Sequence, residues 1–274
     1  MSDAVTRRTV ERLRAAPKYR QVHADTIADI VEREAAHGAS DADLERRARL
    51  KLHKVIADYL LIAQPSRILR GLDEAAADGP QALRDWCRNV LARHFSTAER
   101  LGDLDRLYPV ILGLTGPAGS IADLACALNP FTVPWLRAAT QATYTGYDLN
   151  LRYVQLGASF LELTDATSTV LHCDVLVRPE EIRADVALLL KTFHCIEDRR
   201  PGAALALVDN LAAGSVVVSF PVRTMSGRVA TFTRRHLDQL TGLAQRRGWE
   251  QRRASLAGEE LVVLVKQDRR GRPG

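Results

Sequence analysis

The sequence predicts an α/β protein in which a mostly parallel sheet follows an all-helical amino-terminal domain. Its 274 residues are 46% hydrophobic and 26% charged, close to the averages of globular proteins, so the chain can bury a core. Near residue 105 the apolar pattern changes from helical spacing to short runs separated by helical stretches. We therefore expect a helical domain over residues 1–105 and a sheet domain over residues 106–274.

The first 113 residues predict five or six short helices. Apolar residues recur at helical spacing over residues 22–31 and again over residues 52–60, and no strand pattern interrupts them. Proline and glycine mark the expected helix ends, at Ala16-Pro17, His37-Gly38, Gln64-Pro65 and Asp78-Gly79-Pro80.

Seven short apolar runs predict strands: Ser120–Ala125, Thr143–Tyr147, Thr169–Cys173, Asp185–Lys191, Ser215–Phe220, Glu250–Ser255 and Glu260–Lys266. Helices are expected between them over residues 149–164, 202–213 and 233–247, with a shorter one near Pro134. The last two strands are joined by residues 256–258, too short a connection for a parallel crossover, so they should form an antiparallel hairpin. This pattern resembles the Rossmann-like fold of class I methyltransferases.

Composition excludes several classes of protein. The longest unbroken apolar runs have about five residues, against the ~20 that a membrane-spanning helix needs, so we expect no membrane partner. The first 30 residues contain no apolar run for a signal peptide, which predicts a cytoplasmic protein. The four cysteines, Cys87, Cys126, Cys173 and Cys195, have neither metal-ligand nor disulfide spacing, so we expect reduced thiols and no metal site.

Two basic segments without acids indicate a polyanionic partner. The first carries Arg46, Arg47, Arg49, Lys51 and Lys54, and the second carries Arg223, Arg228, Arg234 and Arg235. Clustered Lys and Arg attract the phosphates of nucleic acids. The alternative interpretation is that each segment is simply a solvated helix face.

Residues at successive strand ends indicate a ligand that contains a nucleoside, because ligands of parallel α/β sheets bind at the carboxyl ends of the strands. The first strand ends in small residues around Ala125, and no G-x-G-x-x-G dinucleotide motif follows. The second ends in Asp148, whose carboxylate can accept both hydroxyls of a ribose. The third ends in Asp174-Val175, suited to adenine, and the fourth in Leu190. Taken singly, an aspartate that ends a strand is more often a helix cap or turn former, and it is the recurrence at successive strand ends that favours a ligand.

Four ordered segments resemble motifs of the aminoglycoside-resistance 16S rRNA methyltransferases, which modify a guanine N7 in the decoding site. The segments are residues 94–100, residues 123–130, residues 185–192 followed by 195–197, and residues 219–221. The resemblance spans nearly the whole chain. The sequence departs from the family at Ala127, where glycine is common, and at Phe193-His194.

The resemblance implies that S-adenosylmethionine is the cofactor and assigns its contacts. It places cofactor contacts at Tyr59, His94, Phe95, Ser96, Arg100, Ala125, Asp148, Asp174, Val175 and Leu190. In this assignment Arg100 meets the methionine carboxylate, Asp148 binds the ribose, Asp174 and Val175 contact the adenine, and Leu190 lies beneath the methyl donor.

The resemblance also implies the partner, which is 16S rRNA in the small (30S) ribosomal subunit. The basic residues Arg46, Arg47, Arg49, Lys51, Lys54, Arg223 and Arg228 are the expected rRNA contacts, and we expect a monomer. Guanine N7 carries a free lone pair, so positioning is the expected mechanism and no catalytic side chain is required. Phe193 is the candidate for stacking on the flipped base, with a core position as the alternative. A methyltransferase of another rRNA base or of a small molecule, and a non-catalytic rRNA-binding factor, stay open as alternatives.

Overall fold

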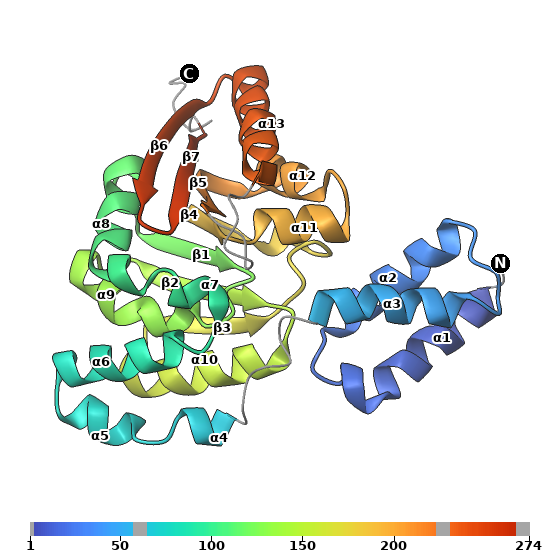
Figure 1. Ribbon diagram of the computed structural model, residues 1–274, viewed down its shortest axis with the longest axis horizontal. Coiled ribbons are helices and arrows are strands. Elements are labelled where there is room, and N and C mark those ends of the chain that lie inside the picture. Colours follow the sequence, from blue (N-terminus) through green and yellow to red (C-terminus); the bar gives the residue numbers. More distant parts are fainter. Residues whose placement is uncertain (1–2, 57–64, 223–230, 267–274) are drawn as a thin grey trace, which may run out of the picture.

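The computed structural model describes residues 3–56, 65–222 and 231–266 (Figure 1). Its seven strands are β1 (Ser120–Leu124), β2 (Thr143–Asp148), β3 (Ser168–His172), β4 (Arg183–Leu190), β5 (Ala212–Pro221), β6 (Glu250–Leu256) and β7 (Glu259–Val265). They form one sheet in the order β3-β2-β1-β4-β5-β7-β6. The first five strands are parallel, and β7 is antiparallel to both β5 and β6, which confirms the predicted sheet and its terminal hairpin.

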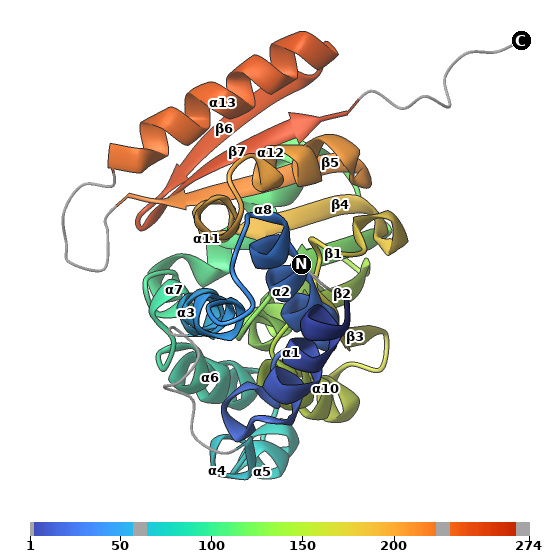
Figure 2. The same cartoon turned by 90° about the vertical axis from the view of Figure 1, so that its right-hand side faces the viewer.

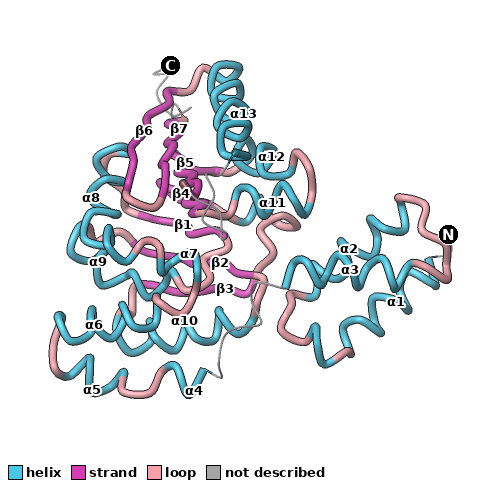
Figure 3. The backbone as a smooth tube through the Cα atoms, viewed as in Figure 1, coloured by secondary structure: helices cyan, strands magenta, loops and turns pink. Residues whose placement is uncertain are grey.

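Helices cover both faces of the sheet. On one face α8 (Leu104–Thr115), α9 (Val133–Ala139) and α10 (Leu151–Thr164) share a core with the strands (Figure 3). On the other face lie α11 (Phe193–Arg199), α12 (Ala203–Asn210) and α13 (Thr231–Arg247). The central strands are long apolar runs because both of their faces are buried. Helix α11 was not predicted, since its seven residues follow the strand directly without a proline or glycine to mark a boundary.

Eight α-helices precede the sheet in the described residues, more than the five or six predicted. Besides α8 they are α1 (Asp3–Ala15), α2 (Ala24–Ala36), α3 (Leu44–Ile56), α4 (Pro65–Ile68), α5 (Leu72–Ala77), α6 (Pro80–Leu91) and α7 (Phe95–Ala98). The four predicted helix ends all coincide with observed ends: α4 and α6 begin at the expected prolines, and α1 and α2 end beside Ala16 and His37.

The helices before the sheet belong to two different cores. Helices α1, α2 and α3 pack around their own cluster, which includes Leu13, Val31 and Leu52 (Figure 2). Residues from Ile68 onward instead join the cluster beneath the sheet. The core therefore changes between α3 and α4, although the hydrophobic period changes only near residue 105. Helices α4, α5 and α6 keep helical spacing and pack on α9 or α10, and α8 packs on β6 and β7.

Candidate functional site

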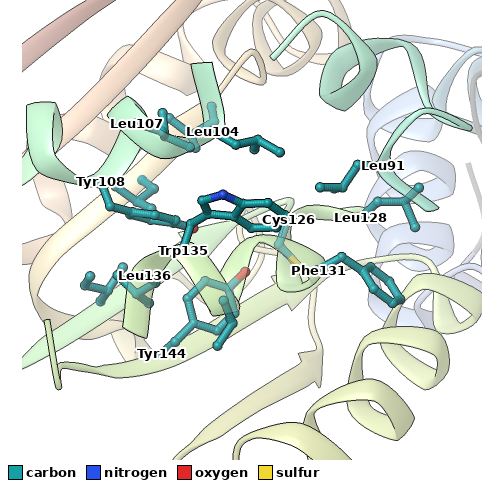
Figure 4. Packing of buried hydrophobic residues seen from close by; sticks show 14 of the residues in the cluster. Leu91, Leu104, Leu107, Tyr108, Cys126, Leu128, Phe131, Trp135, Leu136 and Tyr144 are labelled. Carbon is teal, nitrogen blue, oxygen red and sulfur yellow. The ribbon is translucent and has the colours of Figure 1, made fainter. Parts of the chain in front are cut away.

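The loop after β1 is the first part of a site at the carboxyl edge of the sheet. Positive φ angles at non-glycine residues occur, within the described ranges, at Ala125 (55°), Ala127 (44°) and Lys191 (57°), all following β1 or β4. Between the two alanines, the side chain of Cys126 is buried in the cluster around Trp135 (Figure 4). A left-handed conformation in a residue with a Cβ costs roughly 1–2 kcal/mol and is retained mainly at functional sites.

Asp148 at the end of β2 holds this loop in place. Its Oδ2 atom accepts a hydrogen bond from the Ala127 N–H at 2.9 Å, and its Oδ1 atom accepts one from the Asn150 N–H at 2.8 Å. Burial raises the pKa of Asp148 to about 6. A carboxylate has about four acceptor positions, so two remain for hydroxyl donors such as those of a ribose.

Asp123 at the end of β1 is a site residue that the sequence assignment left out. Its side chain is fully buried, and its Oδ2 atom accepts hydrogen bonds from Asn129 Nδ2 at 2.5 Å and from the Tyr144 hydroxyl at 2.7 Å. Burial raises its pKa to about 6, and its Oδ1 atom has no partner among the described residues. The signal in the sequence was an acid within a mainly apolar strand, since aspartate is seldom fully buried unless it is paired.

Arg100 forms a hydrogen bond with Asn129 and an ion pair with Glu259, a residue that is distant in the sequence. Its Nε and Nη2 atoms donate to the two carboxylate oxygens of Glu259 at 2.5 and 2.9 Å, and Nη1 donates to Asn129 Oδ1 at 3.1 Å. Three of the five N–H bonds of the guanidinium are therefore used, and two have no partner within the described residues. Neither composition nor spacing indicated Glu259, since it lies 159 residues from Arg100.

Lys191 adds a second buried cation next to Arg100. Its ammonium donates to Glu99 Oε2 at 2.5 Å, and burial lowers its pKa. Leu190, the residue before it, is buried at the end of β4, where the sequence placed it.

The three other predicted residues of the motif before α8 lie at the start of α7. His94 Nδ1 and the Ser96 hydroxyl are 2.8 Å apart, and the His94 ring lies edge-on to Tyr153 at 5.8 Å. Phe95 is 42% exposed, so its ring is accessible to a ligand.

Asp174 has partners that the adenine assignment did not predict. Its two oxygens accept hydrogen bonds from Arg199 at 2.7 and 3.1 Å, from the Thr26 hydroxyl at 2.7 Å and from the Leu176 N–H at 3.0 Å. These four bonds fill its acceptor positions, so an adenine amino group would have to replace one of them. Val175 is buried and lines a cavity of about 430 Å³ between α2 and α12.

The interpretation of Phe193 as the base-stacking residue is corrected by its position. The ring is fully buried, 5.5 Å from the Phe220 ring and 5.2 Å from the His236 ring. A ring packed in the core between two others presents no face to a nucleobase, so the alternative of a core position holds.

Helix α3 carries the first basic segment, but in space that segment is not free of acids. Arg46 pairs with Asp43 at 2.9 Å, Arg47 with Glu34 at 2.7 Å and Arg49 with Glu45 at 2.8 Å. Lys51 and Lys54 are exposed, and no described acid forms an ion pair with either. The local basic character of this helix therefore rests mainly on the two lysines. Tyr59, Arg223 and Arg228 lie outside the described residues.

The donor and acceptor groups at this edge fit the parts of S-adenosylmethionine. The acceptor positions of Asp148 match ribose hydroxyls, and the two remaining N–H bonds of Arg100 match a carboxylate. No group of three or more His, Cys, Asp or Glu in residues 3–56, 65–222 and 231–266 is placed to hold a metal ion. Over the same ranges, every helix is too short or too polar to span a bilayer.

Comparisons with known proteins identify the family to which the chain belongs. Residues 14–264 match the family described as Ribosomal RNA methyltransferase (FmrO). A protein of Frankia casuarinae named 16S rRNA (guanine(1405)-N(7))-methyltransferase is 30% identical over 266 residues, covering 95% of this chain and 92% of the relative. A protein of the same name from Micromonospora rosea is 29% identical over 228 residues, covering 82% and 83%. The crystal structure of 16S rRNA methyltransferase RmtF in complex with S-adenosyl-L-homocysteine superposes with a TM-score of 0.76 at 26% identity, covering 97% of this chain and 100% of that chain.

Proposed function

Because the chain belongs to the FmrO family of ribosomal RNA methyltransferases, we propose that it transfers a methyl group from S-adenosylmethionine to N7 of guanine 1405 in 16S rRNA. The observation that carries this proposal is the meeting of Arg100, Asp123 and Asp148 at one edge of the sheet, inside the region matched by the family. Relatives that align over most of the chain carry the name of this activity, which supports the choice of base.

The chain's own residues would bind the cofactor at its two ends. Asp148 would accept the ribose hydroxyls, Val175 and Asp174 would lie against the adenine, and Arg100 would hold the methionine carboxylate. His94, Phe95, Ser96, Ala125 and Leu190 complete the proposed contacts, together with Tyr59. When bound, the cofactor supplies a methyl group already activated by its sulfonium charge.

The protein's part in the reaction is alignment. Guanine N7 has a free lone pair at neutral pH, so no side chain has to remove a proton before the methyl group is transferred. Holding two reactants in the reactive geometry lowers a barrier by up to roughly 7–11 kcal/mol in ideal cases. The strained backbone at Ala125, Ala127 and Lys191 suits this role, because it fixes the loops after β1 and β4.

The proposed substrate is the rRNA within the small ribosomal subunit, which the enzyme would meet as a monomer in the cytoplasm. Helices α1, α2 and α3, with Lys51 and Lys54 exposed, offer a compact basic unit for docking. We propose that this helical region makes one contact with the rRNA and that Arg223 and Arg228 in the sheet domain make a second.

Methyl transfer from tritiated S-adenosylmethionine tests the function directly. We expect incorporation into isolated 30S subunits, with reduction-cleavage mapping to guanine 1405. Transfer at a different nucleotide would favour a methyltransferase of another base. Tight binding of subunits without incorporation would favour a non-catalytic factor.

A matching phenotype is expected in a susceptible bacterium. A methyl group on N7 adds a positive charge and removes a Hoogsteen acceptor, which should exclude cationic drugs that bind there. Expression should give high resistance to gentamicin and kanamycin with little protection against neomycin, as the family resemblance implies. Equal sensitivity with and without expression of active enzyme would contradict the assignment to this base.

A further inference from the structure

The turn between β6 and β7 contacts the segment that carries Arg100. The Ala257 N–H donates to Asp103 Oδ2 at 2.6 Å. A Cβ atom on Gly258 would lie 2.9 Å from the carbonyl oxygen of Glu99, closer than real Cβ atoms approach, so this position requires glycine. The turn of the β6–β7 hairpin therefore packs closely against the backbone on either side of Arg100.

Glu259, the first residue of β7, forms a two-point ion pair with Arg100. The side chains are 1% and 2% exposed, so both charges are buried. Burial is the largest single effect and would raise the pKa of Glu259, but the charge and hydrogen bonds of Arg100, the charge of Lys191 and a hydrogen bond from Ser219 together hold this pKa below its usual value. The pair is thus ionised at neutral pH, and its geometry is fixed by two parallel hydrogen bonds.

The direction of the remaining N–H bonds follows from this pair. Glu259 uses Nε and one N–H of Nη2, and Asn129 uses one N–H of Nη1. One N–H on each terminal nitrogen is left, and donors on the two terminal nitrogens of a guanidinium can bind a carboxylate. A guanidinium on a flexible side chain could rotate away, whereas one held at three N–H bonds cannot.

We propose that Glu259 is a positioning residue that orients Arg100 toward the methionine carboxylate of the cofactor. The proposal rests on the proposed function, since it assumes that S-adenosylmethionine is the ligand. It assigns β7, the strand between β5 and β6, to recognition of the amino-acid end of the cofactor. The nucleoside end is recognised separately, at the ends of β2 and β3.

A pair of ligands separates positioning from a general structural role. S-adenosylhomocysteine contains the amino-acid end, and 5′-methylthioadenosine has the same nucleoside thioether without it. Calorimetry should show that Glu259→Gln weakens S-adenosylhomocysteine binding about tenfold or more, while 5′-methylthioadenosine affinity changes less than about twofold. Glu260→Gln is the matched control, since this neighbouring side chain accepts a hydrogen bond from Ser255 near the surface, and it should change neither affinity.

Further variants keep the test decisive. If Glu259→Gln fails to fold because it leaves Arg100 buried without its partner, Glu259→Asp keeps the charge and shifts its position, and the same selective loss is expected. In turnover with 30S subunits, KM for S-adenosylmethionine should rise with kcat at saturation largely retained. Arg100→Gln should show the same selectivity, and its loss should not add to that of Glu259→Gln.

Two outcomes would overturn the proposal. An equal loss of affinity for both ligands would mean that Glu259 has only a general structural role. Unchanged affinity for both would mean that Glu259 does not contribute to cofactor binding. Wild-type protein that binds neither ligand would instead contradict the proposed function, so the two failures are distinguishable.

Discussion

Two features of its surroundings shift the pKa of Asp148 in opposite directions. Burial raises its pKa to about 6, whereas the two backbone N–H donors favour the ionised form and limit the rise. An ionised carboxylate accepts hydroxyl hydrogen bonds more strongly than a protonated one, so ligand binding at this residue competes with a proton near pH 6.

Cofactor affinity should therefore fall as the pH drops below about 6. Protonation of Asp148, with its pKa of about 6, removes an acceptor of the ribose hydroxyls, so affinity is full above this pKa and is lost below it. Asp148→Asn should bind S-adenosylhomocysteine roughly 10- to 100-fold more weakly at pH 8, with a smaller slope between pH 5 and 8. Calorimetry across that range checks both expectations. An unchanged slope in the variant would assign the titration to another group, such as Asp123, whose pKa is also about 6.

Several residues of the candidate site could be predicted because they follow strands. An acid after β2 and a small residue after β1 are local signals, and both lie where the sequence placed them. Glu259 could not be found in this way, because its role depends on a contact across 159 positions. Phe193 was misinterpreted for the same reason, since only the fold shows that its ring packs against Phe220.

Helix α3 illustrates how an element changes the meaning of a sequence pattern. The basic run contains no acid, but the helix and its neighbours bring acids to three of its arginines. Arg47 in particular neutralises Glu34, whose side chain is only 8% exposed, so its removal would leave a buried charge. An rRNA-binding test must therefore spare Arg47.

Lys51→Glu with Lys54→Glu is the appropriate variant of α3. We expect weaker binding to 30S subunits, with the slope of log affinity against log salt reduced by roughly two, because each lysine would release one counterion. S-adenosylhomocysteine affinity should stay unchanged. Arg183→Glu with Arg246→Glu changes the same charge at exposed positions near the opposite edge of the sheet, and subunit binding should fall less. Equal losses in the two double variants would mean that α3 is only a solvated face.

At the scale of the whole molecule, polar contacts join two separate cores. The Thr26 hydroxyl on α2 is fully buried and donates to Asp174 after β3. On the same helix, Asp29 pairs with Arg199 and Arg200 of the sheet domain. The Gln21 carbonyl accepts from the Leu151 N–H, next to the loop that follows β2. Helices α1 to α3 therefore pack against the strand ends that would bind the nucleoside.

Thr26→Val tests how much this junction contributes. Valine keeps the shape but removes one hydrogen bond to a buried carboxylate, so the free energy of unfolding should fall by about 1.5–3 kcal/mol. Amide exchange should accelerate in α2 and stay slow in β4, as measured by mass spectrometry. Thr164→Val, which removes only a bond to a carbonyl of its own helix, should have a smaller effect. Identical stability and exchange in the two variants would contradict a role for the junction.

The sequence predicted the sheet better than the division of the helices. Each strand carries its own apolar run and its own boundary residues, so the seven strands and their final hairpin could be located from local signals. The partition of α1 to α8 between two cores could not, because all eight helices have the same period. Which face of a helix meets which neighbour is decided by tertiary packing.

The ion pair of Arg100 with Glu259 determines when the proposed cofactor site can be completed during synthesis. Strand β7 inserts between β5 and β6 and leaves the ribosome after both of them. Until it does, the sheet lacks an inner strand and Arg100 lacks its carboxylate. A nascent chain can therefore bury most of its apolar residues before Arg100 has its partner, and the proposed cofactor site is complete only once β7 has joined the sheet.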